Sequence, residues 1–371
     1  MKTRYFTEVS TLTVPQFTGI SNVVSELSKW LLSNRPDSSC FFIENSIIDT
    51  AIVMKALEAR SGLPFGDQIK QITWGTLENA LEKHTYNANV GLFGGIKQKI
   101  RSKFDYEAQI IYDLTYVVVP ELHHRHTVVA HAHSIEEDVL SNDLNICISD
   151  WTRQDLCDYV GADRGKCMVS HLGYDIEEPQ PRDDVEPYYL MLGTIEPRKN
   201  HALVLRAIRE RPEWLQGRKL VVAGGDGWGP SFKSMISQYG LDGLLGRQVY
   251  HFGFCSNQMR AKLLRNARGL IYPSIYEGFG LPVIEAMAVG TPVVTSRSSS
   301  LPEAGGSAAF YMDPTSVDEL VSAVSALETT LNDAAAAAKL RQKMSEHVAT
   351  FSWDKFCTAI VSRIEHDVLP A

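Results

Sequence analysis

The sequence predicts an α/β protein built from two doubly wound domains, each a parallel sheet covered by helices. Short runs rich in β-branched and aromatic residues alternate with helical patterns along nearly all of the 371 residues, as in parallel sheets wrapped by helices. A segment rich in proline and acid, residues 175–187, interrupts this alternation near the middle, and such a composition is typical of a linker. Because a domain takes roughly 100 to 200 residues, the chain has room for two cores.

We expect the first domain over residues 1–178 and the second over residues 187–350. Strands of the first domain are expected at 5–9, 40–43, 109–113, 145–149 and 167–172. Strands of the second are expected at 188–193, 219–224, 249–254, 269–272 and 292–295, and its helices begin near residues 199, 230, 256 and 282. The chain after residue 313 is expected to be helical, and residues 351–371 to form a terminal helix that packs on the first domain. Such folds bind ligands at the carboxyl ends of their strands, so we expect the chemistry in a cleft between the domains.

The composition excludes several classes of protein. Lysine and arginine number 36 and aspartate and glutamate 44, which gives a formal net charge of −8 and argues against a surface built to hold nucleic acid. The six cysteines form no C-x-x-C pair, so we expect reduced thiols in a cytoplasm. The amino terminus lacks the succession of charged, apolar and small residues that marks a secretory signal. No window of the sequence reaches about 18 uninterrupted apolar residues. We therefore expect a cytoplasmic protein that does not span a bilayer.

The stretch Tyr276–Thr295 carries the most informative chemical pattern. Glycine lets a ligand approach the backbone and proline favours the first helical position, so Gly278–Pro282 is expected to lead into a helix amino terminus, which binds anions. Glu277 precedes this helix and Glu285 is expected inside its first turn. Both carboxylates would then flank the anion site and suit sugar hydroxyls. The alternative is a surface loop with a helix-capping acid.

Two adjacent basic residues lie in the stretch Leu192–Asn200, which follows an apolar strand and precedes a helix. Arg198 and Lys199 are well placed there to neutralise a diphosphate, arginine through its bidentate fork and lysine as a point charge. The alternative is a solvated charged pair, which is common at helix starts. The position opposite the anion-binding helix favours the diphosphate.

The carboxylates Glu277 and Glu285, with seven residues between them, and the segment GTIEPRKN resemble the hallmark segments of the retaining family 4 glycosyltransferases of GT-B fold. Further similar segments lie at residues 8–10, 18–24, 112–114, 120–121, 148–149 and 155–156, and Trp353 fits the start of the family's terminal helix. The resemblance therefore covers most of the chain. It implies two Rossmann-like domains that face each other across a cleft, and it is greatest to bacterial mannosyltransferases of polysaccharide and O-antigen assembly.

The resemblance also implies roles for individual residues. Glu285 would bind the nucleotide ribose, Arg198 and Lys199 would hold the diphosphate, and Glu277 would face the donor sugar. The implied donor-binding set is Gly19, Arg198, Lys199, the backbone of Phe279, Gly280 and Leu281, and Glu285. The implied catalytic set is Glu277, Arg198, Lys199 and Asp113. In such enzymes the leaving diphosphate helps to deprotonate the incoming hydroxyl, so positive charge near that oxygen is the main catalytic device, and no metal or other cofactor is expected.

Two positions depart from the family's pattern. Thr194 stands where many relatives carry arginine, and Tyr112 where many carry histidine. We therefore expect Arg198 to bear more of the diphosphate, and the role of Asp113 stays open. The histidine run at residues 123–133 contains neither H-E-x-x-H nor a cysteine pair, so we expect no metal there.

The segment 91–104 combines apolar residues at helical spacing with four basic residues. A helix of this kind can lie on an anionic membrane surface. The alternative is a helix whose apolar stripe packs on its own domain, with its lysines in water. The family resemblance favours the membrane, because many relatives extend lipid-linked glycans with basic patches on the amino-terminal domain.

We therefore expect a cytoplasmic, peripherally membrane-associated retaining hexosyltransferase that moves a sugar from a nucleotide diphosphate to a growing, lipid-linked glycan such as lipopolysaccharide O-antigen. GDP-mannose is the first candidate donor. Donors of galactose, glucose, rhamnose or fucose, and UDP- or dTDP-sugars in general, remain alternatives. A nucleotide-sugar epimerase would share this architecture but need no acceptor. An oxidoreductase would need the glycine-rich motif that binds a nicotinamide dinucleotide, and this motif is missing from its usual place. A non-catalytic subunit would lack the carboxylates and basic residues that are present.

Overall fold

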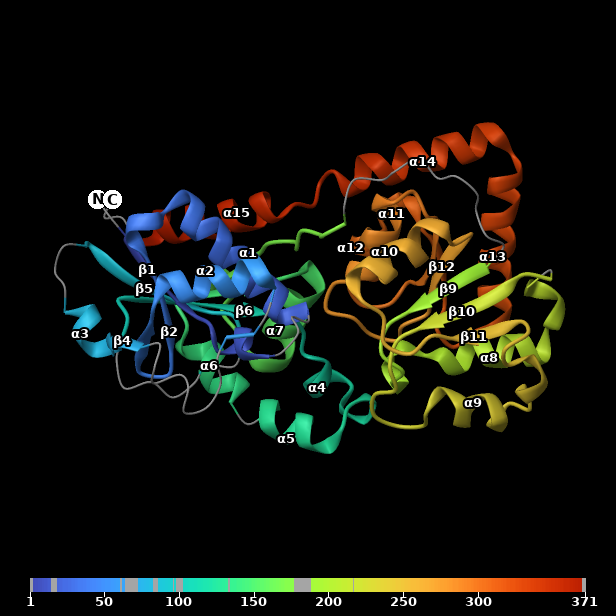
Figure 1. Ribbon diagram of the computed structural model, residues 1–371, viewed down its shortest axis with the longest axis horizontal. Helices are drawn as coiled ribbons and strands as arrows, with labels where there is room; N and C mark the ends of the chain where they lie inside the picture. Colours follow the sequence, from blue (N-terminus) through green and yellow to red (C-terminus); the bar gives the residue numbers. More distant parts are fainter. Residues whose placement is uncertain are drawn as a thin grey trace. The chain divides into compact units, whose positions relative to one another are not determined.

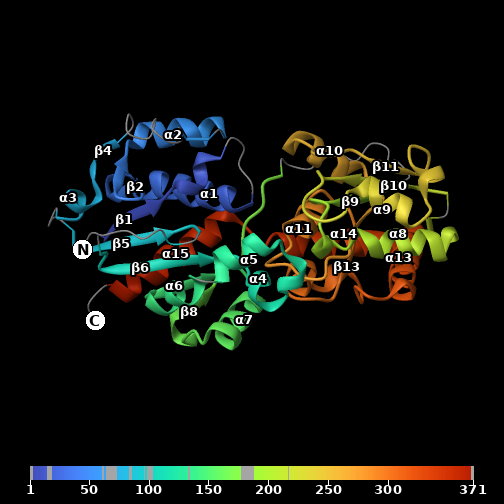
Figure 2. The same ribbon diagram turned by 90° about the horizontal axis from the view of Figure 1, so that it is seen from below.

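The computed structural model describes residues 3–14, 19–60, 62–63, 73–82, 86–95, 97, 103–132, 134–176, 188–215 and 217–368. The chain divides into two compact units (Figures 1 and 2). The first unit comprises Met1–Leu114, Val129–Gly173 and Ser352–Ala371, and the second comprises Thr115–Val128 and Tyr174–Phe351. The division differs from the expected bounds at residues 115–128, which group with the second unit. Most of the expected linker, residues 177–187, lies outside the described residues.

The sheet of the first unit has eight strands in the order β4-β3-β2-β1-β5-β6-β7-β8. Their bounds are β1 Thr3–Glu8, β2 Ser39–Ile43, β3 Ser46–Ile48, β4 Thr73–Thr76, β5 Ala88–Phe93, β6 Tyr106–Ile111, β7 Leu144–Cys147 and β8 Cys167–Val169. From β2 to β8 all neighbours are parallel, whereas β3 pairs antiparallel with both β2 and β4. The five expected strands are present, and β3, β4 and β5 were not expected.

The helices of the first unit include several that begin at a side-chain cap. Their bounds are α1 Gly19–Asn34, α2 Thr50–Ala59, α3 Leu77–Leu81, α6 Ile135–Ser141, α7 Asp150–Val160 and α15 Trp353–Val368, while α5 Arg125–Ala132 crosses the division. In α7, the Ser149 hydroxyl accepts from the Thr152 amide, and Gly161 ends the helix in the left-handed conformation, as capping rules predict. The described helices include none long and apolar enough to cross a membrane.

The expectation of a helix over residues 91–104 is wrong in the part that the structure describes. Residues 91–93 belong to β5, which is hydrogen-bonded between β1 and β6. Leu92 and Phe93 are buried there, because a strand inside a parallel sheet is covered on both faces and therefore apolar. Residues 96 and 98–102, including Lys99 and Arg101, lie outside the described residues.

Two further residues of this segment, Lys97 and Phe104, make contacts within the first unit. The ring of Phe104 packs against Phe6, Phe42 and Phe93, with centroids 5.6 to 6.0 Å apart. The ammonium of Lys97 forms an ion pair with Glu107 and is largely buried. Of the apolar residues in this segment, Leu92, Phe93 and Phe104 thus pack within one domain.

The sheet of the second unit has six parallel strands in the order β11-β10-β9-β12-β13-β14. Their bounds are β9 Tyr188–Leu192, β10 Lys219–Ala223, β11 Val249–His251, β12 Gly269–Tyr272, β13 Val293–Ser296 and β14 Phe310–Met312. The helices are α4 Thr115–Val118, α8 His201–Glu210, α9 Phe232–Gln238, α10 Asn257–Asn266, α11 Leu281–Ala288, α12 Leu301–Gly305, α13 Val317–Asn332 and α14 Ala334–Val348. The five expected strands of this unit and the helical tail after residue 313 are confirmed. Among the described strands of this unit, β14 alone was not expected. Gly224–Gly229 connects β10 to α9, as expected of a βα turn.

Candidate active site

The candidate site lies at the carboxyl edge of the second unit's sheet. Arg198 and Lys199 follow β9, in the 3-10 turn η6 (Pro197–Lys199), and Glu277 follows β12. Strands β9 and β12 are parallel neighbours, so their carboxyl ends meet at the same edge. The main chain ties the two loops together, since the Ile275 amide donates to the Arg198 carbonyl at 2.9 Å.

The Glu277 carboxylate binds both cations, one with each oxygen. Its Oε2 lies 2.7 Å from Arg198 Nη1, and its Oε1 lies 2.6 Å from Lys199 Nζ. The Tyr272 hydroxyl donates to Oε1 at 2.9 Å and accepts from Lys199 at 2.7 Å. All three charged side chains are at least 85% buried. We call Arg198, Lys199, Tyr272 and Glu277 the cation cluster.

The electrostatics of the cation cluster keep Glu277 ionised. Burial by itself would raise the pKa of Glu277, but Arg198 and Lys199 outweigh that effect and lower the pKa to about 2. Burial lowers the pKa of Lys199, and the attraction of Glu277 opposes this. A second carboxylate, Glu196, lies 2.8 Å from Arg198 Nη2. The two cations are thus held in place by carboxylates rather than by solvent.

The loop before α11 has the conformation that the sequence suggested. Gly280 caps the helix with a φ of +108°, and Pro282 lies in its first turn. A Cβ at residue 280 would lie 2.8 Å from a methyl carbon of Leu301, so both the backbone angle and the space require glycine. The Phe279 ring is buried against Phe351, with centroids 5.6 Å apart. Its backbone alone is therefore available to a ligand.

Glu285 lies one turn further into α11 than expected. The helix begins at Leu281, so Glu285 is its fifth residue and not part of the first turn. Its Oε1 lies 3.0 Å from Arg260 Nη1, and its side chain is 4% exposed. Burial raises the pKa of Glu285, Arg260 lowers it and Asp175 raises it further.

The remaining two predicted site residues belong to the first unit. Gly19 is the exposed first residue of α1, with open space around the position of a Cβ. Asp113 is half-buried just after β6. Its charge contributes to raising the pKa of the buried Asp155 to about 7, after the larger effects of burial and of Asp158. Gly19 and Asp113 belong to the first unit and the cation cluster to the second, and the roles of Gly19 and Asp113 stay predictions.

Sequence reasoning missed several residues that complete the site. Tyr272 is the last residue of β12, and its sequence pattern indicates only a strand. Arg260 lies on α10, and no motif surrounds it. Ser299 and Ser300 fix the loop by bonding the Glu277 amide and carbonyl, at 2.8 and 2.9 Å. Only the Glu196 carboxylate stood within a recognised segment, GTIEPRKN.

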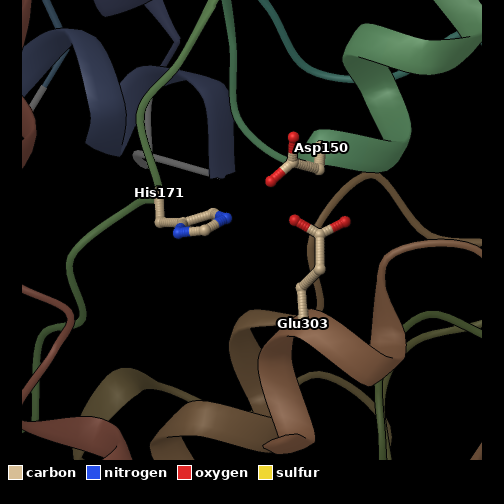
Figure 3. A group of neighbouring side chains, drawn as sticks. All are labelled: Asp150, His171 and Glu303. Atoms are coloured by element: carbon tan, nitrogen blue, oxygen red, sulfur yellow. The ribbon is translucent and has the colours of Figure 1, made fainter.

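A separate aspartate and histidine are close to one another in the first unit. Asp150 begins α7, His171 follows β8, and their nearest ligand atoms lie within 4.8 Å (Figure 3). Figure 3 also labels Glu303, which belongs to α12 of the second unit. The first unit by itself thus supplies two of the three or four protein ligands that a zinc centre takes.

Comparisons with known proteins identify the family. Residues 175–349 match the model of the glycosyl transferases group 1. The O-antigen chain mannosyltransferase B of Escherichia coli is 28% identical over 267 residues, which cover 68% of each protein. The serotype-specific mannosyltransferase WbdA of Escherichia coli is 30% identical over 169 residues, 42% of this chain and 20% of that protein.

The solved structures agree in fold. HepE of Anabaena in complex with UDP-glucose superposes with a TM-score of 0.68 at 15% identity, over 98% of this chain and 99% of that one. At this identity the similarity shows the fold, two parallel-sheet Rossmann-like domains. Residues 175–349 therefore belong to the glycosyl transferases group 1, and the chain has the GT-B fold of glycosyltransferases.

Proposed function

We propose that this chain is a retaining, metal-independent mannosyltransferase that moves mannose from GDP-mannose onto a growing, lipid-linked bacterial glycan. The similarity to two mannosyltransferases supports mannose, and the O-antigen chain named for one of them supports the glycan acceptor. The observation that carries the proposal is the cation cluster, because it holds two buried positive charges beside the start of α11. Such charges stabilise a leaving diphosphate.

In the proposed reaction the bond between the mannose anomeric carbon and the diphosphate oxygen breaks. The acceptor hydroxyl oxygen bonds to the same carbon on the same face, and its proton passes to the departing GDP. Arg198 and Lys199 would stabilise the negative charge that grows on the diphosphate. Glu277 would keep the two cations in position and face the sugar, while Glu285 would hold the ribose.

A thermal-shift screen of nucleotide sugars tests the donor. A ligand that binds only the folded protein raises the melting temperature, and the stabilisation grows with the logarithm of its concentration over its dissociation constant. We expect GDP-mannose to stabilise more than UDP-glucose, UDP-galactose, dTDP-rhamnose or GDP-fucose. A larger shift with a UDP- or dTDP-sugar would identify that nucleotide sugar as the donor and would leave the proposed reaction unchanged.

Product analysis tests the reaction itself. With GDP-mannose and a mannosylated acceptor, proton NMR should show an α-linked product, because the donor is α-configured and configuration is retained. Transfer should persist in EDTA. Loss of transfer in EDTA that a divalent ion restores would overturn metal independence, and release of an isomerised nucleotide sugar without acceptor would indicate an epimerase.

We also propose that the lipid-linked acceptor brings the enzyme to the inner membrane face, since the described part of residues 91–104 packs inside the first unit. Sedimentation with anionic vesicles should then require the lipid-linked acceptor. Equal sedimentation without that acceptor would contradict this proposal.

A further inference from the structure

The carboxylate of Glu285 is only half satisfied by the protein. Its Oε1 forms the ion pair with Arg260 at 3.0 Å. Its Oε2 is buried and has no hydrogen-bond partner among the described residues. A buried acceptor without a donor destabilises the folded protein, so such an atom calls for a ligand. In contrast, both oxygens of Glu277 are bonded within the cation cluster.

Arg260 is the cation that opposes protonation of Glu285. Burial and Asp175 both raise the pKa of this carboxyl, and Arg260 on the neighbouring helix α10 lowers it. Its influence also reaches the thiol of Cys255, whose pKa burial raises and Arg260 lowers. Only the ionised carboxylate can offer Oε2 as a pure acceptor. Removing Arg260 would therefore favour the protonated acid and free the side chain to turn.

We propose that Arg260 is a positioning residue of the donor site: its ion pair with Oε1 orients Glu285 so that Oε2 accepts a hydrogen bond from a ribose hydroxyl of a nucleoside diphosphate. This inference rests on the proposed function, which places the ribose at Glu285. Arg260 acts through Glu285 and need not touch the nucleotide. The chemistry selects a ligand with a hydroxyl donor at the sugar ring, and a deoxygenated ring would leave Oε2 unsatisfied.

Calorimetric titration with GDP and with 2′,3′-dideoxy-GDP tests this role. We expect the full protein to bind GDP at least tenfold more tightly than the dideoxy analogue. In Arg260→Gln, GDP affinity should fall about tenfold while dideoxy-GDP affinity stays unchanged, and Arg260→Lys should recover part of the loss. Lys262→Met, an exposed residue on the same helix, is the matched control and should bind like the parent.

The pH dependence gives a second readout. In Arg260→Gln, GDP affinity should fall more steeply than in the parent as the pH decreases, because the Glu285 carboxyl then lacks the cation that lowers its pKa. Equal weakening of GDP and dideoxy-GDP would overturn the proposal, since it would indicate a direct phosphate contact or a general structural effect. Unchanged GDP binding in Arg260→Gln would overturn it as well. If the parent binds none of GDP, UDP or dTDP, the proposed function itself fails.

Discussion

At the residue scale, the cation cluster is organised by one carboxylate. Glu277 separates two buried positive charges that would otherwise repel each other, and it bonds each of them. Breaking a buried ion pair by removing one partner costs about 3–5 kcal/mol, because the remaining charge is left uncompensated. Glu277 therefore has a structural role in addition to any contact with the donor sugar.

We predict that Glu277→Gln lowers the free energy of unfolding by about 3 kcal/mol, since Arg198 and Lys199 then lack their counter-ion. Urea unfolding measures the change. GDP should restore more stability to the variant than it adds to the parent, because the diphosphate supplies negative charge. A variant as stable as the parent would show that solvent screens these two cations.

The same carboxylate makes the free energy of unfolding depend on pH. The pKa of Glu277 is lowered from its ordinary value of 4.5 to about 2, so its contribution is fully present above about pH 4.5 and is lost as the pH falls toward 2. We predict that the stability difference between the parent and Glu277→Gln shrinks between pH 5 and pH 3. Urea unfolding at several pH values would reveal it, and a difference that is constant over this range would contradict the low pKa.

Lys199 is the cation whose loss we expect to affect turnover most directly. We predict that Lys199→Met slows transfer by roughly tenfold or more, on the order of 1.4 kcal/mol in the barrier, because positive charge at the leaving diphosphate is lost. Initial rates at saturating donor measure this. Lys339→Met, an exposed residue on α14, serves as control. Equal rates for both variants would show that Lys199 does not contribute to the reaction.

At the scale of an element, the loop before α11 depends on a glycine. Gly280 has a φ of +108° and no room for a Cβ beside Leu301. We predict that Gly280→Ala costs about 1–3 kcal/mol in stability and weakens donor binding by displacing the helix start. In Gly225→Ala the added Cβ meets no atom within 4 Å, so this control should behave like the parent. Thermal unfolding and nucleotide titration compare the two.

The segment 91–104 offers a second test at this scale. Phe104 packs against three phenylalanine rings of the first unit. We predict that Phe104→Ala lowers the free energy of unfolding by about 2 kcal/mol, less than the ~3–5 of a fully buried ring because Phe104 is half-buried. The neighbouring Lys103→Gln should leave stability and vesicle binding unchanged. Vesicle sedimentation that falls in Lys103→Gln would instead support a membrane surface here.

At the scale of the whole molecule, the last helix completes the first unit although it follows the second unit in the chain. The ring of Phe356 in α15 is fully buried, and its carbonyl accepts from the Ser170 hydroxyl at 3.2 Å. Trp30 Nε1 donates to Asp354 Oδ1 at 2.8 Å, and Arg35 pairs with Glu365. The first unit therefore depends on residues far from it in sequence.

We predict that Phe356→Ala destabilises the first unit by about 3–5 kcal/mol, the cost of a buried phenylalanine. Limited proteolysis should then cut first within the first unit, while the second unit keeps its nucleotide affinity. Tyr159→Ala, which removes an exposed ring of the same unit, is the control. Cleavage that begins in the second unit would contradict the assignment of α15.

The sequence by itself determined the fold class and ten of the strands, and it singled out Arg198, Lys199, Glu277 and Glu285 as candidate site residues. These depend on local patterns: apolar runs, glycine and proline at helix starts, and charges that follow strands. The strands β3, β4, β5 and β14 could not be recognised, because β3, β4 and β14 are only three or four residues long and the run at 88–93 has no distinctive period. The resemblance to family 4 glycosyltransferases is confirmed by the match of residues 175–349.

Only the tertiary structure decided which charges meet. Arg198 and Lys199 lie 78 or more positions before Glu277 in the chain, and they come together because β9 and β12 are neighbours in the sheet. Arg260 reaches Glu285 for a similar reason, since α10 packs against α11. The apolar spacing at 91–104 was ambiguous for the same physical reason, because periodicity records which residues avoid water and not whether a membrane or the protein's own core covers them.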